Sequence, residues 1–140
     1  MGARMSGFTI GRVARQAGVA ADTVRYYEHE GLLEKPVRTS AGYRQYSASA
    51  VVRLRFIRQA KELGFSLREI RELLALRVDA RKTCGDVKGR ALRKIADVDR
   101  RIAQLERMQR ALSRLAAQCS GRGPTSACPI IEALERDELR

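Results

Sequence analysis

The sequence contains three cysteines, Cys84, Cys119 and Cys128, whose thiol side chains can bind metal ions or form disulfides. Cys119 and Cys128 flank a segment whose first residues, 120–124, contain two glycines and a proline, so a helix cannot continue through it. The eight residues between them are enough for a loop that turns both sulfurs toward one ion, at about 2.3 Å each. Because thiolates are soft ligands, a pocket of three would favour Hg(II), Cd(II), Pb(II), Zn(II) or Cu(I) over hard cations.

Cys128 directly precedes Pro129, and proline is a favoured first residue of a helix. We expect this helix to run to about residue 136 and to point its positive dipole end at the Cys128 sulfur, which would lower the pKa of the thiol. Two other interpretations of the cysteines stay open. They could be small buried apolar residues, or Cys119 and Cys128 could form a disulfide that acts as a redox switch.

A heptad pattern covers the stretch between the first two cysteines. Alternating steps of four and three meet apolar or small side chains everywhere except at a glutamine, at Ala91, Ile95, Val98, Ile102, Leu105, Gln109, Leu112, Ala116 and Cys119. This pattern predicts a two-stranded coiled coil. One heptad before Ala91 the same seam reaches Cys84, about 50 Å from Cys119 on a straight helix. The two cysteines cannot share an ion within one chain, whereas an antiparallel pair would place Cys84 of one subunit beside Cys119 of the other.

Residues 13–27 have the pattern of two short helices around a glycine turn. Ala14 is small where the helices would cross, Gly18 would supply the positive φ of the turn, and Val24 would pack the second helix onto the first. The second helix would then present three side chains outward, where they could enter a major groove of DNA. These side chains are Thr23, Arg25 and Tyr26.

A strand-like stretch at residues 43–46 follows turn signals and is consistent with a β-wing. Its neighbourhood supplies side chains that suit phosphate contact and groove insertion, namely Arg38, Tyr43, Arg44 and Tyr46. Ordinary packing is the alternative for Tyr27, Tyr43 and Tyr46. Lysine and arginine together number 28 against 16 acidic residues, a net charge of +12. This excess favours a polyanionic partner, with a generally basic solvated surface as the alternative.

Capping residues predict where the other helices begin and end. The expected pattern is a first helix from Thr9 to Gly18, a second that Asp22 caps or opens and that ends at Gly31, a third capped by Ser47 or Ser49, and a fourth that runs from a Ser66–Glu69 capping box through Leu76.

Several classes of protein are not expected. No apolar run approaches the length that spans a bilayer, and residues 1–7 lack the apolar core of a signal peptide. We therefore expect a cytoplasmic protein with reduced thiols and no membrane partner. The sequence offers no nucleophile–base pair, no phosphate-binding glycine loop and no catalytic histidine, so we do not expect an enzyme.

Taken together, these segments resemble the MerR family of regulators. The resemblance is carried by residues 8–11 (FTIG), 24–28 (VRYYE), 30–33 (EGLL), 43–46 (YRQY) and 63–70 (LGFSLREI). It implies a mainly α fold, with a winged helix-turn-helix DNA-binding domain over residues 7–47, a connecting helix pair over 48–80, a long antiparallel coiled-coil dimerisation helix over 83–119, and a C-terminal metal-binding loop and helix over 120–140.

The resemblance also implies a homodimer on a palindromic, double-stranded promoter, where it acts with RNA polymerase. Arg25, Tyr26, Arg44 and Tyr46 are then the first candidates for DNA contact, and Arg38 and Arg53 follow as phosphate contacts. Metal binding would distort a promoter with an overlong spacer and so activate metal-resistance or efflux genes. A redox- or small-molecule-sensing regulator on the same scaffold is the alternative.

The cysteine positions resemble the metal-sensing branch of the family. Members that sense monovalent copper or gold have a serine at the position of Cys84, so a cysteine there implies a divalent ion held between subunits. Gln118 stands where zinc-responsive members have a second cysteine, and the loop has no histidine; the single histidine, His29, is not expected to be a ligand. The three-sulfur set favours Hg(II), with Zn(II), Cd(II) and Pb(II) as the other candidates.

Overall fold

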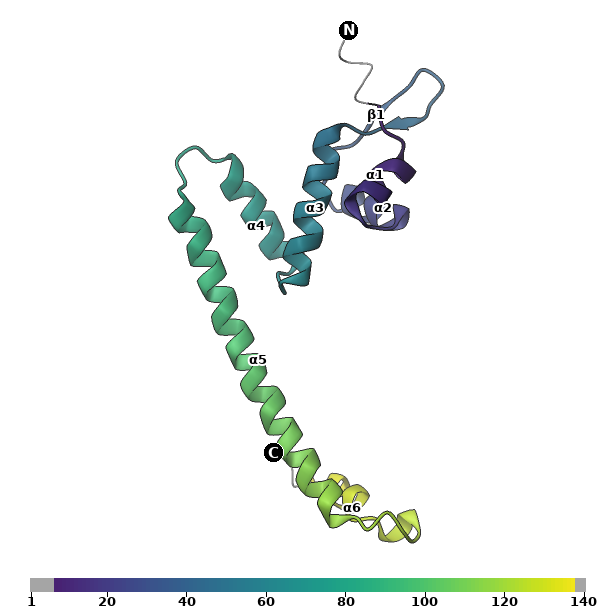
Figure 1. Ribbon diagram of the computed structural model, residues 1–140, viewed down its shortest axis with the longest axis vertical. Helices are drawn as coiled ribbons and strands as arrows, with labels where there is room; N and C mark the ends of the chain where they lie inside the picture. Colours follow the sequence, from purple (N-terminus) through teal and green to yellow (C-terminus); the bar gives the residue numbers. More distant parts are fainter. Residues whose placement is uncertain (1–6, 138–140) are drawn as a thin grey trace. The chain divides into compact units, whose positions relative to one another are not determined.

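The computed structural model describes residues 7–137. The expectations for residues 1–6, at the start of the chain, and for residues 138–140, at the end of the metal-binding segment, lie outside the described residues. The elements are α1 (Ile10–Ala17), α2 (Ala21–His29), β1 (Val37–Arg38), β2 (Arg44–Gln45), α3 (Ala48–Glu62), α4 (Leu67–Val78), α5 (Cys84–Gln118), a 3-10 turn (Thr125–Ala127) and α6 (Pro129–Glu135) (Figure 1). The fold is mainly helical, as predicted.

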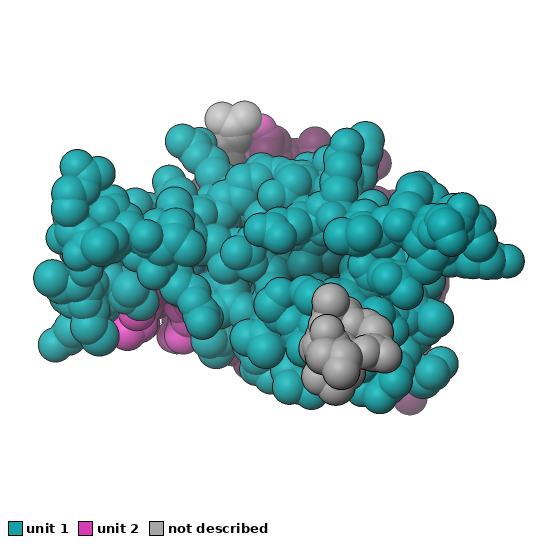
Figure 2. Space-filling view, turned by 90° about the horizontal axis from the view of Figure 1, so that it is seen from above, with its two compact units in different colours: residues 1–90 teal, residues 91–140 magenta. Residues whose placement is uncertain are grey.

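Two compact units make up the chain, residues 1–90 and 91–140 (Figure 2). The sequence places a division near residue 80, in the loop between α4 and α5. The compact units divide ten residues later, because the first turns of α5 are tied to α4 by an ion pair between Arg90 and Glu72.

The helix-turn-helix forms as its capping residues predict. Thr9 caps α1 by accepting the backbone N–H of Arg12 at 3.2 Å. Gly18 ends the helix with a φ of +74°, which an L side chain rarely adopts. Asp22 does not cap α2, because the cap position is Ala20. Asp22 instead lies in the first turn, where its charge complements the helix dipole.

The wing is a two-stranded antiparallel hairpin in which Val37 pairs with Gln45 and Arg38 with Arg44. A bridge between Phe8 and Tyr46 joins this hairpin to the segment before α1. The strand predicted at residues 43–46 therefore spans only Arg44–Gln45. Tyr46 pairs with Phe8 and not with the other strand of the hairpin.

The α3–α4 pair follows the wing. Ser47 occupies the cap position of α3, but its hydroxyl lies 2.6 Å from that of Ser49 and makes no cap hydrogen bond. The capping box of α4 is complete, since Ser66 accepts the N–H of Glu69 while the Glu69 carboxylate accepts the N–H of Ser66. α4 continues to Val78, two residues beyond the predicted end at Leu76.

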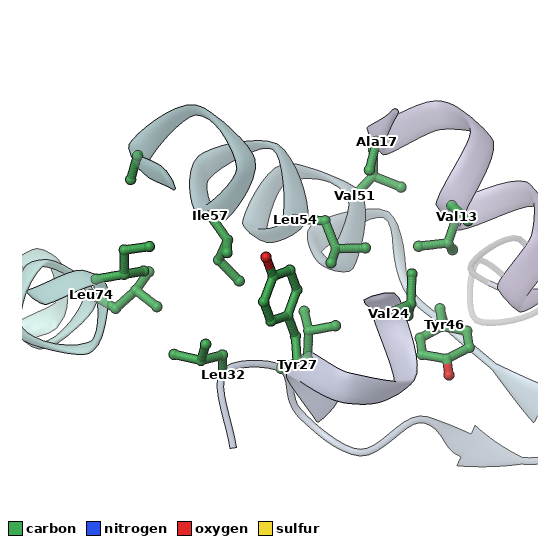
Figure 3. Close-up of a cluster of buried hydrophobic side chains, with 14 residues drawn as sticks. Val13, Ala17, Val24, Tyr27, Leu32, Tyr46, Val51, Leu54, Ile57 and Leu74 are labelled. Carbon is green, nitrogen blue, oxygen red and sulfur yellow. The ribbon is translucent and has the colours of Figure 1, made fainter. Parts of the chain in front are cut away.

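Side chains from α1, α2, α3, α4 and the wing build one hydrophobic core in the first unit (Figure 3). Leu54 and Ile57 of α3 are fully buried against the two short helices. Burial of this kind fixes α2 relative to α3, so that one face of α2 stays free. Among residues 7–137, no helix combines the length and apolar character needed to cross a bilayer.

Candidate metal centre and nucleic-acid interface

The two faces of α2 differ sharply. Val24 and Tyr27 are buried in the core, whereas Arg25 and Tyr26 are exposed and Thr23 is half-buried. Arg25 pairs with Asp22 at 2.8 Å on the exposed side of the helix. Such an exposed pair contributes little to stability, so the guanidinium can exchange this partner for a phosphate or a base edge. Of the three α2 residues that the sequence predicts for DNA contact, Arg25 and Tyr26 lie on the accessible face and the half-buried Thr23 lies at its edge.

The wing residues predicted to contact DNA differ in their exposure to solvent. The ring of Tyr43 is 74% exposed at the tip, and Arg38 is exposed with a hydrogen bond to the carbonyl of Gly42 at 2.9 Å. Tyr46 is only 2% exposed, so its ring belongs to the core and is not free to insert into a groove. For Tyr27 and Tyr46, packing is the role that the structure shows.

Glu28, on α2, holds the wing and was not singled out from the sequence. The Tyr46 hydroxyl donates to Glu28 Oε1 at 2.8 Å, and Arg44 Nη1 lies 3.6 Å from Glu28 Oε2. Burial raises the pKa of Tyr46, and the hydrogen bond to Glu28 raises it further, so the hydroxyl stays a donor. Arg44 is therefore half-buried between the wing and α2. No local sequence signal marks Glu28, because its partners lie 16 and 18 residues away.

Arginines from α3 and α4 bind the carbonyl groups at the ends of the two short helices. Arg55 donates to the carbonyl of Gln16 at 3.2 Å, and Arg71 donates to that of Glu30 at 2.5 Å. Arg53, a predicted phosphate contact, donates to the carbonyl of Leu32 at 3.1 Å and is partly buried. The bonds to Gln16 and Glu30 satisfy carbonyls at or next to a helix end, where the helix leaves them without partners, and all three bonds hold the helix-turn-helix against α3 and α4.

Cys119 and Cys128 lie together at the end of the second unit. The sulfur of Cys119 accepts the N–H of Gly121 at 3.4 Å, and it lies close enough to Cys128 to influence the pKa of that thiol. The backbone N–H groups of Ile131 and Ile130, in the first turn of α6, lower the pKa of Cys128, and the Cys119 contact lowers it further. The lowered thiol pKa that the sequence predicts for Cys128 is thus found, and its main cause is the start of α6.

Cys84 is the first residue of α5 and is exposed. α5 continues from there for 35 residues without interruption, a length of about 50 Å at 1.5 Å per residue. No group of three or more metal-ligating side chains lies together within residues 7–137 of a single chain. One chain therefore brings two of the three cysteines together, and the third cysteine is at the opposite end of the helix.

The predicted seam of α5 is an exposed apolar stripe in the single chain. Ile95, Val98, Ile102, Leu105 and Leu112 are each between 40% and 62% exposed. An apolar stripe of this length on one helix is typical of a coiled-coil partner surface.

Comparison with known proteins agrees with this architecture. The family model for MerR helix-turn-helix regulatory proteins matches residues 8–76, and a second, described as MerR, DNA binding, matches residues 51–115. The chain is 47% identical over 131 residues to the transcriptional regulator ZntR of Escherichia coli K12, which covers 92% of this chain and 93% of that protein.

Two solved structures are also similar. The transcription regulator PbrR691 from Ralstonia metallidurans CH34, in complex with lead(II), has a TM-score of 0.80 at 34% identity, with 91% of this chain and 98% of that chain covered. The dual-function regulator MerR from Bacillus megaterium MB1, in complex with a mercury(II) ion, has a TM-score of 0.69 at 40% identity, with 91% and 99% covered. The chain belongs to the MerR family of helix-turn-helix regulatory proteins.

Proposed function

We propose that this protein is a metal-responsive transcription regulator that binds a palindromic promoter as an antiparallel homodimer. The observation that supports this most is the division of three thiols between the two ends of α5. Cys119 and Cys128 lie together after its last turn, and Cys84 begins it on the same apolar seam. Antiparallel pairing along the exposed stripe brings Cys84 of one subunit beside Cys119 and Cys128 of the other, twice per dimer.

The ligand of this site is a soft divalent metal ion. Three sulfurs, one of them with a lowered thiol pKa, suit Hg(II), Pb(II), Cd(II) and Zn(II) better than hard cations. Relatives that bind lead(II) and mercury(II) support the same choice. We favour Hg(II), because the ligand set is three thiolates without the extra cysteine or histidine that a tetrahedral zinc site would use.

Promoter DNA is bound by the exposed face of α2 and by the wing. Thr23, Arg25 and Tyr26 enter the major groove, while Arg38, Tyr43, Arg44 and Arg53 contact the backbone around it. Tyr46 contributes by holding the wing on α2 through the hydrogen bond from its hydroxyl to Glu28. The net charge of +12 supplies the sequence-independent attraction to phosphates.

The regulatory step is a change in promoter shape. Metal binding closes the Cys119–Cys128 loop onto Cys84 of the other subunit and shifts the two DNA-reading heads relative to each other. The spacer between the polymerase-recognition hexamers is then bent and untwisted, so that RNA polymerase can use it. The metal drives this change only by binding the distorting conformation more tightly than the other. Footprints that are identical with and without metal would contradict this step.

A metal titration of the reduced protein tests the proposed site. Hg(II), Cd(II), Pb(II), Zn(II) and Cu(I) are competed against each other on the wild type and on Cys84→Ser. We expect two divalent ions per dimer, with thiolate-to-metal charge-transfer absorption, and loss of specific binding in Cys84→Ser.

Two results would overturn the proposal. Preference for Cu(I) with no effect of Cys84→Ser would show a two-cysteine monovalent site. Transcription that responds to oxidation of Cys119 and Cys128, and to none of the five ions, would show a thiol–disulfide sensor.

A further inference from the structure

Two adjacent residues of α4 bind two different parts of the molecule. Arg71 Nη2 donates to the carbonyl of Glu30 at 2.5 Å and lies 3.4 Å from the Glu30 carboxylate, at the carboxyl end of α2. Glu72 Oε1 accepts from Arg90 Nη1, in the second turn of α5, at 2.7 Å. Consecutive side chains on a helix point about 100° apart, so α4 binds the DNA-reading helix on one side and the start of α5 on another.

These contacts differ from the ordinary surface ion pairs of the chain. Pairs such as Arg58–Glu62 and Arg110–Glu106 join residues of one helix turn and connect no separate elements. Arg71–Glu30 and Arg90–Glu72 span 41 and 18 residues and join separate elements. A pair that bridges two elements restrains their relative position, which a pair within one turn cannot do.

The series continues from α2 to the wing. Glu28 lies two residues before Glu30 on the last turn of α2 and pairs with Arg44 of β2. Three ion pairs therefore join α5 to α4, α4 to α2, and α2 to the wing. α4 itself is rigid, because its capping box is complete, and Ile70 attaches it to the core of the first unit. A displacement of α4 would therefore also move the elements that are packed against it.

We infer that Arg71 and Glu72 are positioning residues that transmit movement of the first turns of α5 to the recognition helix. The inference rests on the proposed function, since the metal ligand Cys84 begins the same helix that Arg90 links to α4. A displacement of α5 on metal binding pulls Glu72 through Arg90. Arg71, on the same rigid helix, then moves the end of α2 through Glu30. Neither residue binds metal or DNA.

The tyrosines provide a direct measurement of this coupling. The chain has four, and Tyr26 and Tyr27 lie on α2 while Tyr43 and Tyr46 lie in or beside the wing. Protein labelled with 3-fluorotyrosine, bound to a duplex that it selects from a random DNA library, is titrated with Hg(II), Pb(II) or Zn(II). The fluorine resonances then report the DNA-reading surface, and thiolate absorption reports metal occupancy in the same sample.

Four variants are compared with the wild type. Glu72→Gln removes the ion pair with Arg90, and Arg71→Gln removes the ion pair with Glu30. The double variant Glu72→Arg, Arg90→Glu restores the α4–α5 pair with its charges exchanged. Glu106→Gln, which removes an ion pair within α5, is the matched control. We expect the two single variants to bind metal and DNA within threefold of the wild type while their metal-dependent transcription falls about fivefold. The metal-induced shifts of their fluorine resonances decrease in proportion to the loss of transcription. The double variant with exchanged charges recovers the fluorine shifts and the transcription.

Each remaining outcome counts against the inference. Full fluorine shifts and full activation in Glu72→Gln would overturn it, and so would equal losses in Glu72→Gln and Glu106→Gln. A loss of metal or DNA binding that matches the loss of activation would show a structural role only. A wild type that fails to respond to any of the three ions would instead overturn the proposed function, which makes the two failures distinguishable.

Discussion

The two compact units of the chain differ in where their apolar side chains lie. In the first, apolar residues of α1, α2, α3 and α4 bury one another, and Leu54 and Ile57 have no exposed surface (Figure 3). In the second, α5 leaves large apolar side chains such as Ile102 and Leu105 about half exposed or more. The DNA-reading unit thus has a core of its own, while the α5 seam is exposed apolar surface.

This difference separates two kinds of stability. Folding of the first unit depends on contacts within one chain, so its unfolding free energy does not depend on concentration. In the proposed dimer, burial of the α5 seam requires a second copy, so its contribution depends on protein concentration. The proposed metal ligands are divided in the same way, so the proposed site would assemble only when two subunits pair.

The largest expected effect comes from a charge in the seam. Ile102→Asp removes two isoleucines per dimer from the interface, at a cost of about 1.5–3 kcal/mol each, or about 3–6 kcal/mol in total. The dimer dissociation constant rises by at least about a hundredfold, as measured by sedimentation velocity over a range of concentrations. Ala103→Asp, the next residue on the same helix and off the seam, is the matched control. Equal effects of the two variants would show that α5 does not pair along this stripe.

A cavity in the core of the first unit ranks next. Leu54→Ala empties a fully buried position and lowers the free energy of unfolding by about 2–5 kcal/mol. Urea denaturation gives this value at two protein concentrations, and the loss is the same at both. Val52→Ala, on the same helix but 52% exposed, costs much less. If Leu54→Ala raised the dimer dissociation constant as Ile102→Asp does, the stability of the first unit and the pairing of α5 would not be independent.

The capping box of α4 has a smaller effect. Ser66→Ala removes the acceptor for the N–H of Glu69 and destabilises the first unit by about 1 kcal/mol. Thermal unfolding followed by circular dichroism measures the loss, and Ser66→Asp, which keeps an acceptor at the cap, restores most of it. An unchanged melting temperature in Ser66→Ala would contradict this account of the cap.

The smallest predicted effect concerns Cys128. Its thiol pKa is lowered by the N–H groups of Ile131 and Ile130, so the thiolate forms at a lower pH than in the unfolded chain. In the metal-free protein, the pH midpoint of Cys128 alkylation by iodoacetamide, measured by mass spectrometry, lies below the midpoint for the same peptide in urea. Equal midpoints in the folded and unfolded protein would contradict the geometry at the start of α6.

Local signals predicted most of the fold. Thr9, Gly18 and the Ser66–Glu69 capping box form caps whose geometry depends on neighbouring residues only, and each is found where the sequence predicts it. The heptad pattern likewise predicted one long helix, and α5 runs without a break from Cys84 to Gln118.

The residues that hold the DNA-reading surface could not be predicted in this way. Glu28, Arg55 and Arg71 act through partners 16 to 41 residues away, and periodicity carries no information on such pairs. Tyr46 fits both a groove contact and a core residue by its type, and only packing against α2 decides between them. For the candidate site, the sequence placed the thiols of Cys119 and Cys128 together, but whether Cys84 joins them depends on a second chain.

Complementation between two inactive variants tests the central claim, an intersubunit site, most directly. Cys84→Ser is mixed with a Cys119→Ser, Cys128→Ser double variant, the subunits are exchanged through mild denaturation, and Hg(II) or Pb(II) binding is followed by thiolate absorption. In an antiparallel pair, the heterodimer unites the intact Cys84 of one subunit with the intact Cys119 and Cys128 of the other. We predict one three-sulfur site per heterodimer, although neither homodimer has any. If the mixture has no more three-sulfur binding than the separate variants, the three cysteines do not meet across the dimer, and the account is wrong.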